Sequence, residues 1–467
     1  MAGDSASATG ATLTDLVRAA RLISLALLIA VLCNGASVYM KRTGLLDREA
    51  YNNAWSVHCA PVDPDGAVVV AEPRCCANVT DAQTEMYESD AHIKLEEESL
   101  RYIFDSQGPE IGFKLVKDLF VVLLTAYCAF LVGKRIVPAP AIREAWPVFL
   151  LVGYVLISFL SSSYFNGPLF AIAGLRAFMF ALLALLGLWL VPRLGDIARC
   201  VGALLVLQMP LIPWELFQGI HLHGHWLPYF LASRVSGTFV LPNSLGIFAV
   251  TALAFFYSFA SNRSWVPWLC IAALAAIYYA GSGAGIICLG VLLFNMLYDR
   301  APEKRRAHIV IGGILAGLLL VWLLPEISGR EDVYGSVLEG GRLGHLVLFV
   351  AEHDRVQLLF GSGLGAGKGA TLGLMNLVSP EAIDAAWLDA VQFTDSTITG
   401  LMTEIGLLGA VMFYAALVWA GRRDPAARPF YWVVVLSSLV VNITAFFPVN
   451  FLLGLAWAHS IGCARRA

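Results

Sequence analysis

Continuous apolar runs of about 20 residues recur along the whole chain, and this feature constrains the fold more than any other. A run of this length lets an α-helix cross the hydrocarbon core, where only elements that satisfy their own backbone hydrogen bonds are stable. The runs are continuous and do not alternate with period two, which excludes a transmembrane β-barrel. We therefore expect an all-α polytopic membrane protein.

The composition excludes the other broad classes of protein. Of the 467 residues, 58% are hydrophobic and 14% are charged, whereas about a quarter of the residues of a soluble domain are charged. These proportions also exclude a disordered chain, a secreted disulfide scaffold and a nucleic-acid-binding protein. The bilayer is therefore an expected partner, and nucleic acid is not.

The apolar runs predict about twelve transmembrane helices, with the longest later interruption between the ninth and the tenth. The predicted spans are 19–40, 112–132, 146–163, 171–192, 198–219, 243–260, 265–281, 284–298, 308–324, 400–420, 429–447 and 450–463.

Lys and Arg are concentrated in alternate connections, which places these connections and both termini in the cytoplasm. The other side holds two long loops that are rich in acidic residues. If the first loop lies in an oxidising periplasm, one disulfide from Cys59 to Cys75 or to Cys76 is expected, which leaves one thiol over. The predicted organisation is a cytoplasmic N-terminus with the first helix (1–40), an external insertion (41–111), helices two to nine (112–324), an external loop (325–399) and helices ten to twelve (400–467).

Two arginines near the outer face are candidate functional residues, because a charge at membrane depth costs about 2.5–3.5 kcal/mol on insertion scales. Arg176 lies in the fourth span, where the alternative is an arginine that snorkels to the headgroups. Arg234 precedes a Ser-Gly-Thr turn and the helix that begins at Pro242 and Asn243. The free N–H groups of this helix would point outward, as an anion site requires. The alternative is a capped helix start beside an interfacial arginine.

The 325–399 loop supplies further basic groups. Arg342 and His345 are three residues apart and would share one face of an amphipathic helix. The glycine-rich run 359–369 is similar to a phosphate loop but lacks its full pattern, because Ser362 and Gly369 occupy positions that need Gly and Ser or Thr. Backbone amides and Lys368 could still hold a diphosphate. A flexible turn is the alternative.

Two acids mark the approach to the tenth span. Asp395 is a candidate base, with a helix N-cap as its alternative role. Glu404 would lie inside the span, where an acid needs a partner or a proton. The histidine run at 221, 223 and 225 fits no zinc template and has no cysteine or carboxylate set beside it, so no metal site is predicted.

Four of these elements, in this order, resemble the O-antigen ligase and O-antigen polymerase superfamily of bacterial membrane glycosyltransferases, which have a GT-C-type fold. Lys117-Asp118, which opens the second span, fits as well, and the resemblance begins at about residue 112. The elements are the Arg176 segment, Arg-x-Ser-Gly-Thr-Phe-x-x-Pro-Asn at 234–243, Gly341-Arg342 with Phe-Gly-x-Gly-x-Gly at 360–365, and Glu-x-Gly-Leu-Leu-Gly at 404–409.

The resemblance implies a polyprenyl-diphosphate-linked oligosaccharide donor and a glycan acceptor at the periplasmic face of the bacterial inner membrane. It implies inversion at the anomeric carbon without a metal or a cofactor. Arg234 and Arg342 are expected to stabilise the diphosphate, and Asp395 to act as general base. Substrate contacts are expected from Arg176, Asn243, His345, Lys368 and Glu404. Whether a chain-length regulator binds is left open.

The subclass depends on Asp395-Ser396, because the ligases typically carry a histidine followed by an asparagine at this place. The Ser-Arg element expected near the seventh span is replaced by Gly281-Ser282-Gly283-Ala284. These departures favour a polymerase of O-antigen or exopolysaccharide over a ligase that acts on lipid A-core. A transporter or flippase of lipid-linked saccharide is the third alternative, although alternating access favours a site near the midplane.

Overall fold

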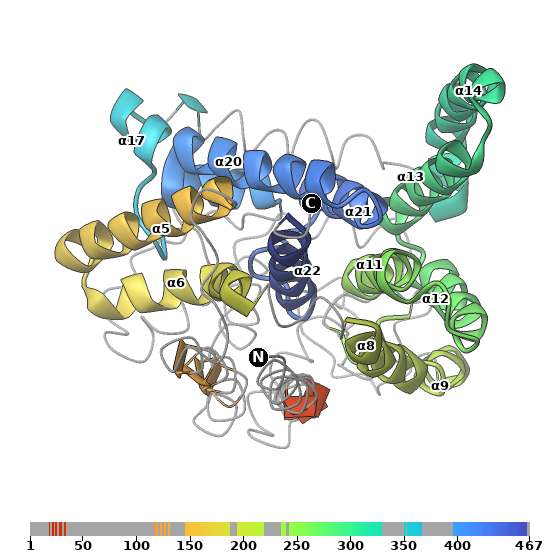
Figure 1. The fold of residues 1–467 in the computed structure, drawn as a ribbon, viewed down its shortest axis with the longest axis horizontal. Helices are drawn as coiled ribbons and strands as arrows, with labels where there is room; N and C mark the ends of the chain where they lie inside the picture. Colours follow the sequence, from red (N-terminus) through yellow and green to blue (C-terminus); the bar gives the residue numbers. More distant parts are fainter. Residues whose placement is uncertain are drawn as a thin grey trace, which may run out of the picture.

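A computed structural model describes residues 145–186, 194–218, 235–239, 242–328, 353–366 and 396–464, together with isolated positions in 18–33, 116–130 and 350–351. Within these residues there are helices and turns but no β-strand (Figure 1). The helices in chain order are α5 (Trp146–Phe165), α6 (Pro168–Leu182), η5 (Leu183–Leu186), α8 (Leu194–Gln208), α9 (Leu211–Gln218), α11 (Pro242–Ala260), α12 (Val266–Ala280), α13 (Gly283–Arg300), α14 (Glu303–Ser328), α17 (Arg355–Phe360), α20 (Thr397–Arg423), α21 (Arg428–Ser438) and α22 (Val449–Ala464).

Five of the described segments are long and apolar enough to cross a membrane, as expected of a helical membrane protein. They are Trp146–Phe165, Ile197–Leu216, Asn243–Ala260, Gly283–Arg300 and Thr397–Arg423. Each coincides with a span predicted from the sequence. The part of the chain that the structure describes is therefore all-helical, and its long apolar helices are suited to a bilayer.

The predicted span at 429–447 is too long, because α21 ends at Ser438. After α21, the main chain bonds to the start of α20 and does not continue as a helix. The Thr397 hydroxyl donates to the carbonyl of Val441 (2.8 Å) and accepts from the N–H of Ile443 (2.8 Å). Non-helical backbone at membrane depth needs partners of this kind from the protein.

The helix α22 lies at the centre of the molecule (Figure 1). Its residues are buried on all sides, which explains its apolar sequence without a polar face. Trp457 packs against Phe180 of α6 and Phe413 of α20, with ring centroids 5.4 and 5.8 Å away. This aromatic contact joins helices that are far apart in the sequence.

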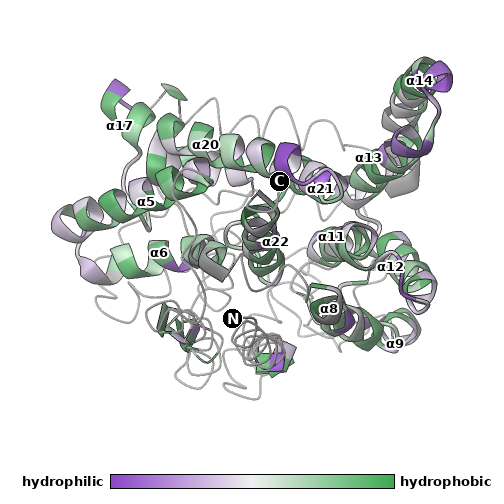
Figure 2. Cartoon of the chain, viewed as in Figure 1, coloured by the Kyte–Doolittle hydropathy of each residue, from purple (hydrophilic) through white to green (hydrophobic). Residues whose placement is uncertain are grey.

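Other helices turn large apolar side chains outward. On α5, Ile157 and Leu160 are about two-thirds exposed, and Trp322 of α14 is similar. Figure 2 shows the helices mainly in hydrophobic colours, with hydrophilic residues at the start of α14 and near the junction of α20 and α21. In water such surfaces would be costly, whereas lipid tails cover them at no cost.

Candidate functional site

The residues that follow α17 form a tight turn, here called the glycine turn (residues 361–366). Gly361, Gly363 and Gly365 have φ values of 85°, 104° and 92°. Only glycine adopts such angles without strain. The backbone conformation of the turn therefore explains why glycine alternates in the Phe-Gly-x-Gly-x-Gly element.

The glycine turn packs against an interruption in α20. Gly406, with φ 68° and ψ −178°, breaks the helical path. The N–H of Ser362 donates to the carbonyl of Thr403 (2.7 Å), and a Cβ on Gly361 would lie 2.5 Å from the carbonyl carbon of Glu404. The two sequence elements at 360–365 and 404–409 are thus in direct contact, and only backbone fits between them.

Two further helices complete the docking site of the glycine turn. On α5, the Ser162 hydroxyl accepts from the N–H of Leu364 (2.7 Å), and the Asn166 amide donates to the carbonyl of Ser362 (3.2 Å). On α6, a Cβ at Gly174 would overlap the backbone nitrogen of Gly365 and lie 2.5 Å from the carbonyl carbon of Leu364. The Arg176 segment therefore approaches the glycine turn through Gly174.

Tyr154 of α5 satisfies one of the carbonyl groups at the interruption of α20. Its hydroxyl donates to the carbonyl of Ile405 (3.0 Å). Removing this donor leaves a partly buried carbonyl without that bond, so Tyr154→Phe should destabilise the protein by about 1 kcal/mol. Thermal unfolding in detergent measures the loss. Tyr164→Phe is the matched control, because the Tyr164 side chain on the same helix is 83% exposed, and an equal loss in both variants would contradict the assignment.

Four backbone N–H groups of the glycine turn are used within the protein. Those of residues 361, 362, 364 and 366 donate to Gln357, Thr403, Ser162 and Gly363, respectively. They are thus not available to an anion, and the turn acts as a docking element in which Leu364 is fully buried. For these four amides, the structure differs from the expectation that backbone N–H groups of the run 359–369 hold a diphosphate.

Arg176 forms an ion pair with Asp118, the acid that opens the second predicted span. Its Nε lies 2.6 Å from Asp118 Oδ2, and the two side chains are 29% and 17% exposed. At about 100° per residue, positions 174 and 176 face opposite sides of α6. Arg176 therefore points away from the glycine turn and is not simply a snorkelling arginine. The guanidinium has five N–H donors, so the contact through Nε leaves other donors that can bind further groups.

The segment 235–239 is anchored in a different part of the fold, on the opposite side of α22 (Figure 1). The N–H of Val235 donates to the carbonyl of Tyr279 (3.0 Å). The N–H of Ser236 donates to Glu215 (2.8 Å), and that of Thr238 donates to Gln208 (2.9 Å). Residues 235–238 are thereby fixed against α8, α9 and α12, and the backbone N–H groups of Ser236 and Thr238 are used within the protein.

The structure changes the interpretation of the start of α20. Ser396 is the N-cap, and its hydroxyl accepts from the N–H of Thr399 (3.2 Å). The capping role considered for Asp395 therefore belongs to its neighbour. Asn243 is half-buried in the first turn of α11, and Glu404 is 1% exposed within α20. Five predicted site residues lie outside the described part of the chain: Arg234, Arg342, His345, Lys368 and Asp395.

The polar groups that hold these elements were not predicted from the sequence. Gln208 and Glu215 fall within the predicted span 198–219, where an amide and an acid are an unusual feature. Ser162 and Asn166 could not be recognised in this way, because polar side chains are common at the ends of membrane-spanning helices. Comparison with known proteins finds no family whose model matches this chain and no curated relative.

Proposed function

We propose that this protein is a membrane glycosyltransferase that polymerises polyprenyl-diphosphate-linked oligosaccharide repeat units. The observation that carries this proposal is the docking of the glycine turn at the interruption of α20. Described parts of three of the four elements behind the family resemblance meet there: Gly174 of α6, the glycine turn and the interruption of α20. This contact supports the proposal because it joins elements of the resemblance that are far apart in the sequence. The described residues of the fourth element, 235–239, lie on the opposite side of α22.

The proposed reaction is a single displacement. An acceptor hydroxyl attacks the anomeric carbon of the donor sugar, the bond from this carbon to the diphosphate oxygen breaks, and polyprenyl diphosphate leaves. The carboxylate of Asp395 takes the hydroxyl proton. Arg234 and Arg342 stabilise the charge that develops on the leaving diphosphate, because a guanidinium binds phosphate oxygens in a bidentate manner. Inversion at the anomeric carbon follows from one direct attack.

The proposed topology has twelve spans, a GT-C-type arrangement and both termini in the cytoplasm of a bacterium. Basic residues support it, since they occupy the junctions α11–α12, α13–α14 and α20–α21. These junctions hold Arg263, then Arg300 with Lys304, Arg305 and Arg306, and then Arg422, Arg423 and Arg428. Because the helices alternate in direction, the three junctions fall on one side, which the positive-inside rule assigns to the cytoplasm. The start of α20 then faces the periplasm.

A transporter of lipid-linked saccharide is the second candidate, and one observation favours it. The interrupted α20 carries a buried acid, Glu404, next to its break. Discontinuous helices are typical of transporter sites near the bilayer midplane. In this protein, however, the glycine turn is bonded into the break, so the freed carbonyls already have protein partners.

Reconstitution with one substrate tests the proposal. The purified protein in nanodiscs receives the host's polyprenyl-diphosphate-linked repeat unit and no other acceptor, with empty nanodiscs as the control. We expect a ladder of increasing chain length on a carbohydrate gel, because donor and acceptor are then the same lipid-linked species. Transfer only after lipid A-core is added would identify a ligase. No product with either acceptor, together with movement of the lipid across proteoliposomes, would identify a transporter.

A further inference from the structure

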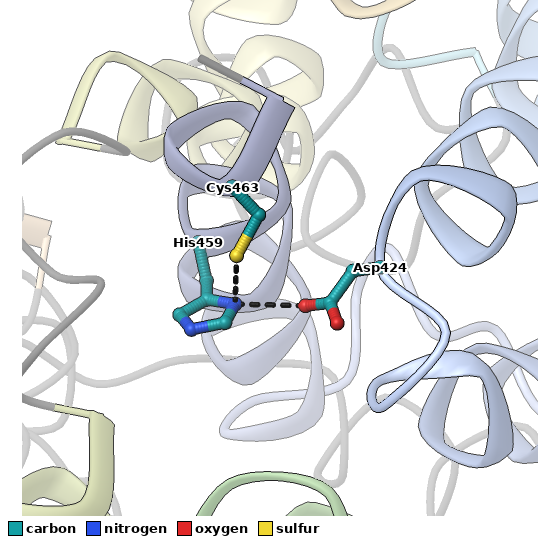
Figure 3. Close-up of side chains that lie close together, drawn as sticks. All are labelled: Asp424, His459 and Cys463. Atoms are coloured by element: carbon teal, nitrogen blue, oxygen red, sulfur yellow. Dashed lines mark hydrogen bonds and ion pairs between the residues drawn. The ribbon is translucent and has the colours of Figure 1, made fainter. Parts of the chain in front are cut away.

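Three side chains that the proposed reaction does not use converge at the end of the central helix (Figure 3). Asp424 lies between α20 and α21, and His459 and Cys463 lie on α22. His459 Nδ1 is 2.8 Å from Asp424 Oδ2 and 3.7 Å from Cys463 Sγ. One carboxylate oxygen, one imidazole nitrogen and one sulfur all lie within 4.8 Å of one another.

The geometry differs from that of a nucleophile with its base. In a catalytic relay the nucleophile and the orienting acid contact different nitrogens of the histidine. Here the carboxylate and the thiol both approach Nδ1 (Figure 3). A ring nitrogen carries either one proton or one lone pair, so a proton on Nδ1 cannot serve both neighbours fully. A cation placed between the three atoms would contact all of them.

We infer that Asp424, His459 and Cys463 form a zinc site. A thiolate, an imidazole and a carboxylate are ligands that Zn²⁺ accepts, and three protein ligands leave one position for water. Tetrahedral zinc with these ligands separates neighbouring donor atoms by about 3.3–3.6 Å. The sulfur–nitrogen distance of 3.7 Å is close to this range. The oxygen–nitrogen distance of 2.8 Å requires the carboxylate to move outward by about half an ångström.

The surroundings orient the ligands. The second carboxylate oxygen of Asp424 accepts from the N–H of Ala427 (3.3 Å), so Oδ2 is left for the histidine and the ion. The ring of Phe259 packs edge-on against the imidazole at 5.1 Å. Hydrogen bonds and packing of this kind around the ligands fix their direction and support metal affinity. Arg422 and Arg423 precede Asp424 but are exposed, so they extend into solvent.

A zinc ion here would bind the α20–α21 connection to α22, the most buried helix. The sequence carried a partial signal, since His459 and Cys463 are four residues apart and share a helix face. Asp424 is 35 residues away from His459 and was not recognisable as their partner. In the proposed topology this site lies on the cytoplasmic side, across the membrane from the proposed chemistry, so it does not take part in glycosyl transfer.

Cobalt substitution tests the site in the full-length protein in detergent. Co²⁺ bound to a thiolate gives a charge-transfer absorption that histidine and carboxylate ligands alone do not give. We expect one equivalent of Co²⁺ to produce this band and Zn²⁺ to abolish it by displacement. Cys463→Ser should remove the band and weaken zinc binding by more than about 100-fold, the upper end of what loss of an outer-shell contact costs.

Matched variants test whether the band comes from these three ligands. Cys270→Ser removes another half-buried cysteine and should keep the band, as should replacement of the 221, 223 and 225 histidines by glutamine. Asp424→Asn provides a second test, because an asparagine oxygen can still accept from Ala427, and it should weaken zinc binding. A wild-type protein without the band, or a Cys463→Ser protein that retains it, overturns the zinc site.

Discussion

Gly174→Ala should lower the free energy of unfolding by about 3 kcal/mol, the upper end of the cost of overpacking, and abolish chain polymerisation. The added methyl group meets the backbone of Leu364 and Gly365, and not the movable end of a side chain. Either the glycine turn leaves α6 or the helix shifts, and both displace the turn from the interruption of α20. The measurements are the thermal unfolding midpoint in detergent and the ladder assay in nanodiscs.

Gly153→Ala is the control, because Gly153 lies on neighbouring α5 and a Cβ there meets nothing within 4 Å. Alanine has the higher helix propensity, by about 0.5–1 kcal/mol, so this variant should be as stable as the wild type or slightly more stable. Equal behaviour of the two variants would mean that the contact between α6 and the glycine turn is not needed. A Gly174→Ala protein that is stable but inactive would mean that the substitution disturbs the site and not the stability of the fold.

Asp395→Asn should reduce polymerisation by about 100- to 10,000-fold, the usual contribution of a general base, without loss of stability. The amide cannot take a proton from the acceptor hydroxyl. Stability should be kept because the hydrogen bond that caps α20 comes from Ser396. The initial rate of ladder formation at saturating donor gives the size of the effect, and thermal unfolding checks the fold.

Ser396→Ala is the matched variant at the next position. It removes the cap bond to Thr399 and should lower stability by about 1 kcal/mol, while the folded fraction still elongates chains. Asp395→Asn should therefore lose activity and keep its stability, whereas Ser396→Ala should lose stability and keep its activity. A normal ladder from Asp395→Asn would refute its role as base and transfer that role to His345. Loss of activity in both variants with equal loss of stability would return Asp395 to a structural role.

Hydropathy located the helices well, because a span is defined by about 20 consecutive residues and needs no knowledge of partners. The predicted segments at 146–163 and 243–260 correspond closely to α5 and α11. The end of α21 was not predictable, since it depends on the bonds of Thr397 with residues after Ser438. Such bonds between distant residues leave no local pattern.

For the candidate site, the sequence indicated which elements matter but not how they are held. The glycines at 361, 363 and 365 were recognised as a unit, but their docking on Ser162 and Thr403 follows only from the fold. Arg176 was singled out from the sequence as an unusual charge. Its ion pair with Asp118 and its direction away from the glycine turn depend on the three-dimensional arrangement of the helices.

The docking of the glycine turn also has a consequence for its connection to α20. Ser362 is bonded to Thr403, within the first two turns of the helix that Ser396 begins. Both ends of the intervening segment are therefore tethered at neighbouring points. Residues 361–366 and the start of α20 are thus held together by their own contacts, whatever the sequence of the segment between them.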